Sequence, residues 1–341
     1  MKGKELRSKL PKLEVTDPDI FHNRRQFVKG IAGASLLTIA NPALHAQEKT
    51  RTPLDVPLKK DDIFPVKRNP KYDPKDLQVT DRLTAATHNN FYEFLPGRGG
   101  PVWKYTEKFK VEPWEIEITG ECAKPMKFSL DDIFKFEQEE RLYRFRCVET
   151  WAMNVPWTGF PLADLLKKVE PTGKAKFVKF YTARKPTEMP GLIEDYAWPY
   201  HEALRIDEAM NPLAFVATGV YNQPLLKQHG APVRIVVPWK YGYKNPKSIV
   251  KIELVERQPL TFWGRPPYMH EYGFLSNVNP NIPHPRWSQE EDRMLEKGKG
   301  SRSGTKRPTQ IFNGYDEFVG KMYPDEPRTM QKPLKPGQIA R

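Results

Sequence analysis

The sequence lacks the motifs by which many enzyme classes are recognised. Its 341 residues contain no G-x-G-x-x-G or Walker-type phosphate loop, no H-E-x-x-H and no G-x-S-x-G. Nucleotide hydrolysis, zinc-dependent proteolysis and serine-esterase chemistry are therefore unsupported. Haem and flavin motifs are absent as well, so any redox chemistry of this chain must take its electrons from outside.

Cysteine is scarce, with Cys122 and Cys147 as the two thiols of the chain, and they do not form a C-x-x-C pair. In an oxidising compartment the simplest interpretation of two cysteines is one disulfide. The surroundings of Cys147 favour a metal ligand instead. Both interpretations stay open at this point.

Long apolar runs are also few, and the clearest follows the arginine pair Arg24-Arg25. It extends from Gly30 to Leu44, and at about 15 residues it is too short to span a bilayer. A basic pair before such a run is typical of a twin-arginine export signal. We expect a signal peptide over 1–46 and export of the folded chain to the periplasm. The alternative is an ordinary basic pair before a buried helix.

The formal net charge is +13, which suits contact with anionic lipid, acidic proteins or a phosphorylated cofactor. No nucleic-acid motif accompanies this charge, so we expect no nucleic-acid partner. No further apolar run is long enough for a membrane span, so membrane contact requires a partner protein.

Composition divides the remaining chain into three parts. Residues 47–85 are charged and proline-containing and predict an extended N-terminal arm; 86–258 predict the core; 259–341 predict a proline-rich C-terminal segment packed on it. Alternating or apolar runs predict strands at 114–118, 142–148, 176–182, 213–218, 233–238 and 248–256. Helices are expected after Ser129, from Pro161, around 200–210 and near 288–297. Strands and helices do not alternate strictly, so the predicted class is α+β with mixed sheets.

One segment carries an unusual cysteine: RFRCVETWAMNVPWTGFPL at 144–162. Cys147 lies at the end of a predicted strand, between arginines and a Trp-rich stretch that we expect to form a loop. Neighbouring positive charge favours the thiolate, and a thiolate binds soft metals. A buried structural cysteine is the alternative.

A second segment, QHGAPVRIVVPWKYGYKNPKSI at 228–249, gathers basic residues in a loop. Lys240, Lys244 and Lys247 offer ammonium groups to a phosphate, and Arg234 extends from the preceding strand. A solvated basic hairpin explains the same pattern. His229 by itself indicates a turn residue rather than a ligand.

Together these segments resemble the sulfite-oxidase-fold molybdopterin enzymes, and among them the protein-methionine-sulfoxide reductase catalytic subunits. The resemblance covers about residues 60–325. It rests on NNFYEF at 89–94, RCVETWAMNVPWTGFPL at 146–162, EMPG at 188–191, APVRIVVPWKYGYK at 231–244 and NPNIPHPRWSQ at 279–289. It implies that family's molybdopterin-binding fold, without a C-terminal immunoglobulin-like domain.

The resemblance also implies a molybdenum site, with one molybdopterin per metal. Cys147 would be the catalytic metal ligand. The residues implied to hold the cofactor are Asn89, Tyr92, Glu93, Thr182, His229, Arg234, Asn245, Pro246 and Lys247.

The implied activity is the reduction of methionine sulfoxide in oxidised periplasmic proteins, with the oxygen leaving as water. Electrons would come from an integral-membrane haem-b subunit and the quinone pool, and the catalytic subunit would be a monomer with a shallow metal site. Two rivals are a sulfite dehydrogenase on the same fold and a non-enzymatic exported binding protein with a Cys122–Cys147 disulfide. The short tail after 259 argues against the first rival, and a metal analysis would decide the second.

Overall fold

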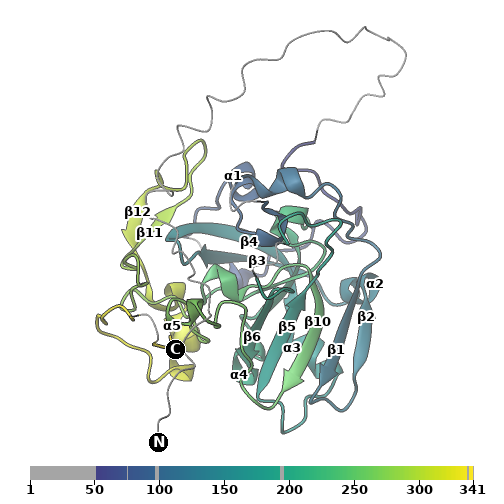
Figure 1. Cartoon of the computed structure of the whole chain (residues 1–341). Coiled ribbons are helices and arrows are strands. Elements are labelled where there is room, and N and C mark those ends of the chain that lie inside the picture. Colours follow the sequence, from purple (N-terminus) through teal and green to yellow (C-terminus); the bar gives the residue numbers. More distant parts are fainter. Residues whose placement is uncertain (1–50, 75, 97–99, 193–195, 336–337, 341) are drawn as a thin grey trace, which may run out of the picture. The chain divides into compact units, whose positions relative to one another are not determined.

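The structure is a computed structural model that describes residues 51–74, 76–96, 100–192, 196–335 and 338–340. The predicted signal peptide over 1–46 lies outside these residues. Arg51–Arg341 form one compact unit (Figure 1). Within the described residues, none of the helices is both long and apolar enough to cross a bilayer.

A five-stranded sheet forms one part of this unit, in the order β2-β1-β10-β5-β6. Its strands are β1 (Glu115–Gly120), β2 (Met126–Ser129), β5 (Phe177–Thr182), β6 (His201–Arg205) and β10 (Ile249–Val255). The β1–β10 pair is parallel and the other pairs are antiparallel. In β1 and β5 every second residue is buried, which confirms the strands predicted from alternation.

A seven-stranded sheet holds the remaining strands, in the order β12-β11-β4-β7-β8, with β3 on β4 and β9 on β7. Their bounds are β3 (Glu139–Arg146), β4 (Trp151–Pro161), β7 (Phe215–Val220), β8 (Gln223–Pro224), β9 (Arg234–Val236), β11 (Glu291–Met294) and β12 (Lys306–Pro308). β3 pairs along one edge of β4, while β7 and β11 share its other edge.

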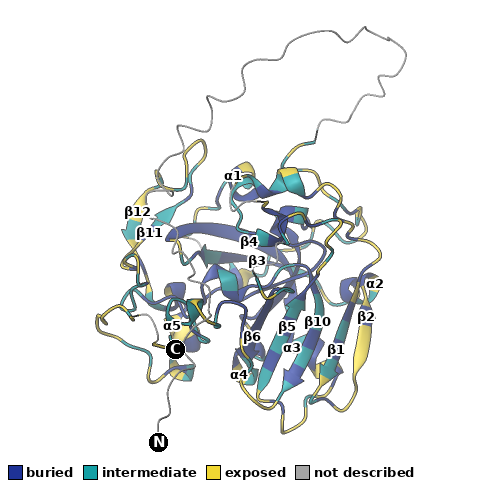
Figure 2. Cartoon of the chain, in the orientation of Figure 1, coloured by how far each residue is buried: buried dark blue, intermediate teal, exposed yellow. Residues whose placement is uncertain are grey.

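The central strand β4 contradicts the expected Trp-rich loop. Its residues are buried from Trp151 to Phe160, and Figure 2 shows the strand in dark blue, whereas β2, the edge strand of the other sheet, is largely exposed. A strand that is covered on both faces has no polar–apolar alternation, so the period-2 signal was absent from the sequence.

The helices are short. They are α1 (Arg82–Thr87), α2 (Leu130–Phe134), α3 (Leu162–Lys168), α4 (Ile206–Ala209) and α5 (Asp316–Val319). Single 3-10 turns lie at Pro70–Tyr72, Tyr92–Phe94, Val102–Tyr105, Lys227–His229, Gly242–Lys244, Tyr268–His270, Ile311–Gly314 and Gly320–Met322. Segregated strands and short helices confirm the α+β class.

Two of the predicted helix starts are confirmed. Ser129 caps α2 through a reciprocal capping box with Asp132. Pro161 precedes α3, whose apolar stripe packs into the core. The helix expected around 200–210 is wrong in its first half, because His201–Arg205 pair with β5 and only Ile206–Ala209 are helical.

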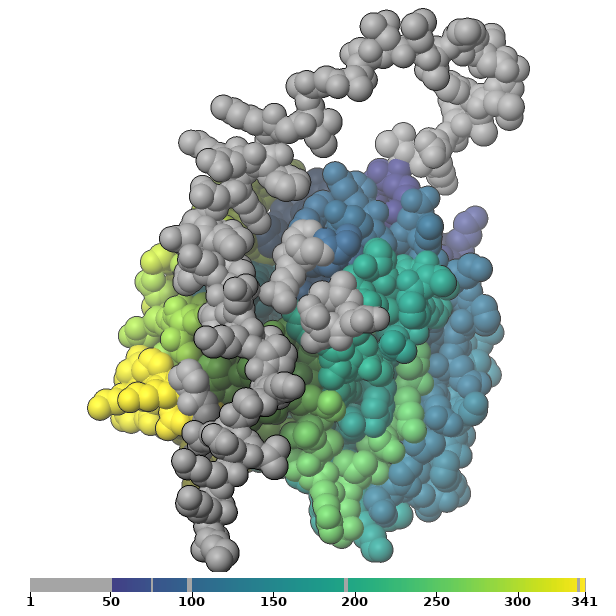
Figure 3. All heavy atoms as spheres, in the orientation of Figure 1, coloured from purple at the N-terminus to yellow at the C-terminus, as the bar shows by residue number. Residues whose placement is uncertain are grey.

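The C-terminal segment extends the seven-stranded sheet. The helix expected near 288–297 is wrong, because Glu291–Met294 form β11, and the backbone N–H of Leu295 donates to the carbonyl of Ala152 at 2.9 Å. Residues 291–294 are therefore extended because they pair with the free edge of β4. Both strands of this segment join the core sheet, so its described residues contain no separate sandwich; its last residues, yellow in Figure 3, lie at the surface.

Candidate functional site

Cys147 lies in the tight loop between β3 and β4. Its backbone N–H donates to the carbonyl of Trp151 at 2.9 Å, and the N–H of Thr150 donates back to the carbonyl of Cys147 at 3.0 Å. The four-residue loop 147–150 ends in Thr150, whose φ of 76° is left-handed, a conformation that short hairpin loops commonly use. The loop places the thiol at the end of the sheet with 7% of the residue exposed.

Three groups surround the sulfur. The backbone N–H of Glu149 donates to Sγ at 3.4 Å, and the Asn90 amide lies 3.8 Å from it. The Glu149 carboxylate lies 4.0 Å from Sγ and accepts from Asn90 at 2.9 Å and from the Trp151 indole at 3.3 Å. These bonds hold an exposed carboxylate beside the thiol.

The flanking positive charge does not outweigh the burial of this thiol. Burial raises the pKa of Cys147 well above its usual range and the Glu149 charge raises it further, whereas the charges of Arg146 and Lys247 lower it. Arg144 turns to Asp76 and Gln310 instead, and Arg146 donates to the Cys147 carbonyl. The thiol therefore stays protonated until a cation such as a metal takes the place of its proton.

Both cysteines are free in the structure, which argues against the alternative of a Cys122–Cys147 disulfide. Cys122 pairs by an isolated bridge with Pro171, after β1 in the five-stranded sheet, whereas Cys147 follows β3 in the other sheet.

A pocket of about 810 Å³, including its opening, lies against Cys147. The aromatic side chains that line it are Tyr92, Phe145, Trp151, Trp157, Tyr243, Trp263 and Tyr272. Gly242 brings the backbone against Phe145, because a Cβ there would lie 2.5 Å from the ring.

Six of the predicted site residues line this pocket: Asn89, Tyr92, Cys147, His229, Arg234 and Lys247. They come from the segment after α1, the β3–β4 loop, and the segment from 227 to 247. The other four, Glu93, Thr182, Asn245 and Pro246, are not among its lining residues.

Those four support the wall of the pocket. Glu93 is buried and accepts from the Thr182 hydroxyl at 3.4 Å. The Asn245 side chain accepts from the Val237 N–H at 2.6 Å, and the Pro246 carbonyl accepts from the Ile235 N–H at 3.0 Å. These bonds tie the 245–247 turn to β9 and thereby position Lys247.

Arg234 brings an uncompensated positive charge to the pocket. Its guanidinium donates to the carbonyls of His229 and Asn245 at 2.9 and 3.2 Å and lies 4.8 Å from the Trp157 ring centre. None of the ion pairs found in the described part of the chain includes Arg234. Burial lowers its pKa, yet a guanidinium remains charged at neutral pH. Such a buried cation favours an anionic ligand.

Lys247 adds a second cation. Burial and the nearby Arg234 charge lower its pKa to about 8, while Glu93 acts in the opposite direction. Its side chain passes directly over Gly230, where a Cβ would lie 2.6 Å from the Lys247 Cβ; the φ of Gly230 is +97°. Glycine is therefore required for Lys247 to reach the pocket.

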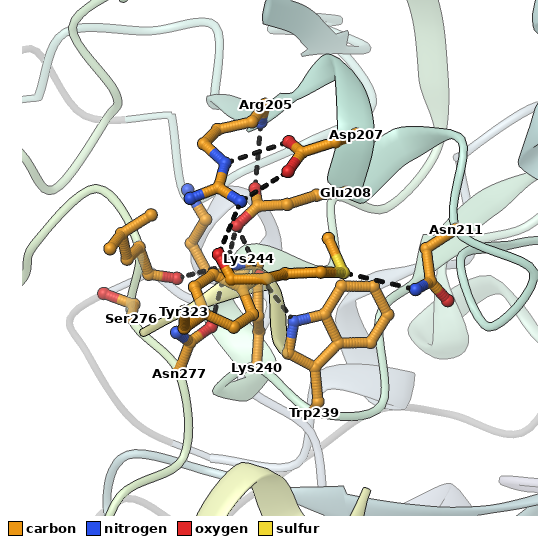
Figure 4. A network of polar contacts seen from close by, with 12 residues as sticks. Arg205, Asp207, Glu208, Asn211, Trp239, Lys240, Lys244, Ser276, Asn277 and Tyr323 are labelled. Carbon is orange, nitrogen blue, oxygen red and sulfur yellow. Dashed lines mark hydrogen bonds and ion pairs between the residues drawn. The ribbon is translucent and has the colours of Figure 1, made fainter. Parts of the chain in front are cut away.

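The two other lysines of this segment do not line the pocket. Lys240 pairs with Glu208 at 2.7 Å (Figure 4), and Lys244 pairs with Glu202 at 2.6 Å. All four side chains are buried. Neither alternative, a phosphate site or a solvated hairpin, therefore holds for these two lysines. Their charges are neutralised inside the protein.

The pocket fits the cofactor that the resemblance implies. Among the described residues, no three His, Cys, Asp or Glu side chains converge as a metal cluster, so a metal here would bring most of its ligands with it. A molybdopterin would bring dithiolene sulfurs, and Cys147 would add a protein thiolate. The buried Asn89 Oδ1 and His229 Nδ1 lack hydrogen-bond partners, and the two cations suit its phosphate.

His229 presents an acceptor rather than a charge. Its Nε2 donates to the Ala85 carbonyl at 3.1 Å, which leaves Nδ1 as a lone-pair acceptor. Burial lowers its pKa to about 4, so the ring is neutral at physiological pH. A pterin ring, which carries N–H donors, complements this atom.

Several lining residues escaped the sequence analysis. Asn90 and Glu149 are direct neighbours of predicted residues, Asn89 and Cys147, and that adjacency was the available signal. Trp263 and Tyr272 come from the C-terminal segment, where nothing in the local pattern pointed to the pocket.

Comparisons with known proteins identify chains that are similar to this one. Residues 103–263 match the family described as oxidoreductase molybdopterin binding domain. The protein-methionine-sulfoxide reductase catalytic subunit MsrP of Burkholderia mallei is 43% identical over 92% of this chain and 93% of its own length. The subunit of the same name from Pseudomonas syringae is 50% identical over 73% of this chain and 74% of its own. Among solved structures, the sulfane dehydrogenase SoxCD from Paracoccus pantotrophus covers 71% of this chain and 60% of its own, at 18% identity and a TM-score of 0.40.

Proposed function

Because the chain belongs to the family of protein-methionine-sulfoxide reductase catalytic subunits, we propose that it reduces methionine sulfoxide residues in proteins to methionine. The observation that carries this proposal is a lone buried thiol, Cys147, in a pocket with two cations and unpaired polar atoms. Those features suit one molybdopterin per metal.

The residues of the pocket have distinct roles in this proposal. Cys147 supplies the protein thiolate to the metal. Arg234 and Lys247 hold the phosphate end, and Asn89 and His229 bind the pterin. When bound, the molybdenum centre supplies the oxygen-transfer and electron chemistry, which none of these side chains provides.

The aromatic walls suit the substrate. A methionine side chain gains dispersion and sulfur–aromatic contact against rings such as Trp151 and Trp263. Burial raises the pKa of Tyr92, so its hydroxyl keeps its proton at neutral pH and can donate to a sulfoxide oxygen. The exposed Glu149 stands beside the thiol, where a side chain carried by a protein has access.

The cellular setting is part of the proposal. The twin-arginine pattern in 1–46 supports export of the loaded, folded protein to the periplasm. The absence of haem and flavin motifs supports an outside electron source, for which an integral-membrane haem-b subunit fed by quinones is proposed. Oxidised periplasmic proteins are the proposed substrates, and the catalytic subunit is proposed to be monomeric.

Metal and pterin quantification tests the assignment. Wild type is expected to hold molybdenum and pterin in a 1:1 ratio, and Cys147→Ser is expected to lose molybdenum and activity. The matched control is Cys122→Ser, at the other buried thiol, which is expected to keep both. Full metal loading and activity in Cys147→Ser would refute the role of that residue.

The substrate is tested on the same preparations. Reduction of an oxidised, Met-sulfoxide-containing protein with an artificial electron donor is compared with oxidation of sulfite by an artificial acceptor. The proposal expects the first reaction at least 100-fold faster, expressed as kcat/KM. A preference for sulfite would replace it with the sulfite dehydrogenase alternative.

A further inference from the structure

Side chains from the C-terminal segment hold the loop that carries Cys147. The Trp287 indole N–H donates to the carbonyl of Val148 at 2.9 Å, and the Gln289 amide donates to the same oxygen at 2.8 Å. Both lone pairs of that carbonyl are thereby used. The peptide next to the cysteine is held from outside its own hairpin.

Arg146 holds the adjacent peptide. Its guanidinium donates to the Cys147 carbonyl and to the Gln289 amide oxygen, the latter at 2.8 Å. The side chain is fully buried, with Asp292 at 3.9 Å as its nearest carboxylate. Gln289 therefore bridges the two held carbonyls, because it accepts from Arg146 and donates to Val148.

Arg293 holds the far end of the loop. Its backbone N–H donates to the carbonyl of Thr150, and its guanidinium donates to the Thr150 hydroxyl, both at 2.8 Å. Thr150 has the left-handed φ of 76°, which a β-branched residue adopts only when its surroundings enforce it. We call these four residues, Arg146, Trp287, Gln289 and Arg293, the loop clamp.

The loop clamp lies outside the lining of the pocket. None of its four side chains is among the pocket-lining residues, so in the described structure they reach the site only through the loop backbone. They hold the carbonyls of Cys147, Val148 and Thr150. The direction in which Sγ leaves the backbone depends on those peptides.

We propose that Gln289, together with Arg146 and Trp287, is a positioning residue that sets the direction of the Cys147 thiolate toward the metal. The C-terminal segment is then part of the metal site, although it supplies no ligand. This inference rests on the proposed function. Partners that orient a metal ligand from behind affect metal affinity or activity by about 10- to 100-fold when removed.

The test uses the full-length, metal-loaded protein and two variants. Gln289→Met removes the bridge at similar side-chain length, and Trp287→Phe removes one N–H donor while keeping a ring. The matched control is Trp114→Phe, because the Trp114 indole also donates to a backbone carbonyl, that of Ile249, at 2.9 Å, far from the loop. Molybdenum content, the Mo(V) electron paramagnetic resonance spectrum, kcat, KM and Tm are measured for each.

Positioning predicts a specific pattern. Gln289→Met should lower molybdenum content or kcat by about 10- to 100-fold and shift or broaden the Mo(V) spectrum, with KM changed less than twofold. Trp287→Phe should give a smaller change in the same direction. Trp114→Phe should lower Tm alone and leave the spectrum as in wild type.

Two results separate the possible failures. Wild-type spectra and metal content in both loop variants would overturn the inference while leaving the proposed function intact. Wild-type protein without molybdenum would overturn the proposed function itself. If Gln289→Met does not fold, Trp287→Phe decides, since its wild-type spectrum would be sufficient to reject the inference.

Discussion

Replacing Lys240 by methionine removes a cation from the buried network of Figure 4. Its Nζ lies 2.7 Å from the Glu208 carboxylate and donates to the Leu275 carbonyl at 2.6 Å and to Asn277 Oδ1 at 2.9 Å. The side chain of Lys240 is 0% exposed and that of Glu208 is 1% exposed. The variant therefore leaves a carboxylate in the core without its cation.

The expected cost follows from desolvation. Removing one member of a buried ion pair costs about 3–5 kcal/mol, because the remaining charge cannot return to water. Glu208 keeps the Tyr323 hydroxyl at 2.5 Å and the Arg205 N–H at 2.9 Å, which places the loss near the lower end, at about 3 kcal/mol. Burial also lowers the pKa of Lys240 to about 8, so desolvation outweighs the pairing.

Urea unfolding at pH 7 measures this loss, and calorimetry should show Tm lowered by roughly 6 °C at about 2 °C per kcal/mol. Adding Glu208→Gln removes the stranded charge and should recover about 1–3 kcal/mol. The control is Lys251→Met, whose lysine lies 4.0 Å from Glu117 with both side chains more than a third exposed. That variant should change stability by less than about 1 kcal/mol.

The double variant Lys240→Met/Glu208→Gln is the decisive measurement. If Lys240→Met costs no more than Lys251→Met, the pair is not desolvated in the way its burial implies. If the double variant is less stable than Lys240→Met alone, the unpaired Glu208 carboxylate was not the cause of the lost stability. Either result refutes the reasoning.

Three further predictions concern local interactions. His201 donates to the Pro199 carbonyl and accepts from Arg265, and burial lowers its pKa from 6.5 to about 4. The unfolded chain is therefore protonated first as pH falls, and up to about 3 kcal/mol of unfolding free energy should be lost between pH 6.5 and 4, measured in urea. Gly230→Ala should cost about 1–2 kcal/mol for its left-handed φ and lower the pterin content by displacing Lys247. Ser129→Ala should cost about 1 kcal/mol in the same assay, because α2 loses its capping box.

Each of these has a contrary outcome. A His201→Gln variant with the same pH dependence as wild type would show that another group causes the loss. Normal pterin content in Gly230→Ala would mean that Lys247 reaches the pocket by another path. Equal stability of Ser129→Ala and wild type would show that water replaces the cap without loss.

Local patterns predicted those elements whose stability is local. β1 and β5 alternate because one face is buried, and α2 begins at Ser129 because the cap is made within four residues. β4 and β11 were missed for the opposite reason. β4 is covered on both faces, and β11 becomes a strand only because an edge of β4 is free for pairing.

The residues of the site also fall into those that the sequence predicted and those that it did not. Cys147 and Arg234 were found because their residue types and their resemblance to a known family pointed to sulfur ligation and an anionic cofactor. For Lys240 and Lys244 both alternatives, a phosphate site and a solvated hairpin, were wrong, because no feature of the sequence shows that each meets a carboxylate in the core. Trp263, Tyr272 and Gln289 approach the pocket or its loop from more than a hundred residues away in the chain.

By itself, the sequence determined which chemical groups are present and which short-range structures they form: a single thiol with metal-binding surroundings, the basic residues, the capped helix and the alternating strands. The tertiary structure alone decided which charges are neutralised, which remain for a ligand, and which distant side chains hold the cysteine loop. The physical reason is that burial and pairing set the cost of every charge and polar atom, and both depend on contacts between segments that are far apart along the chain.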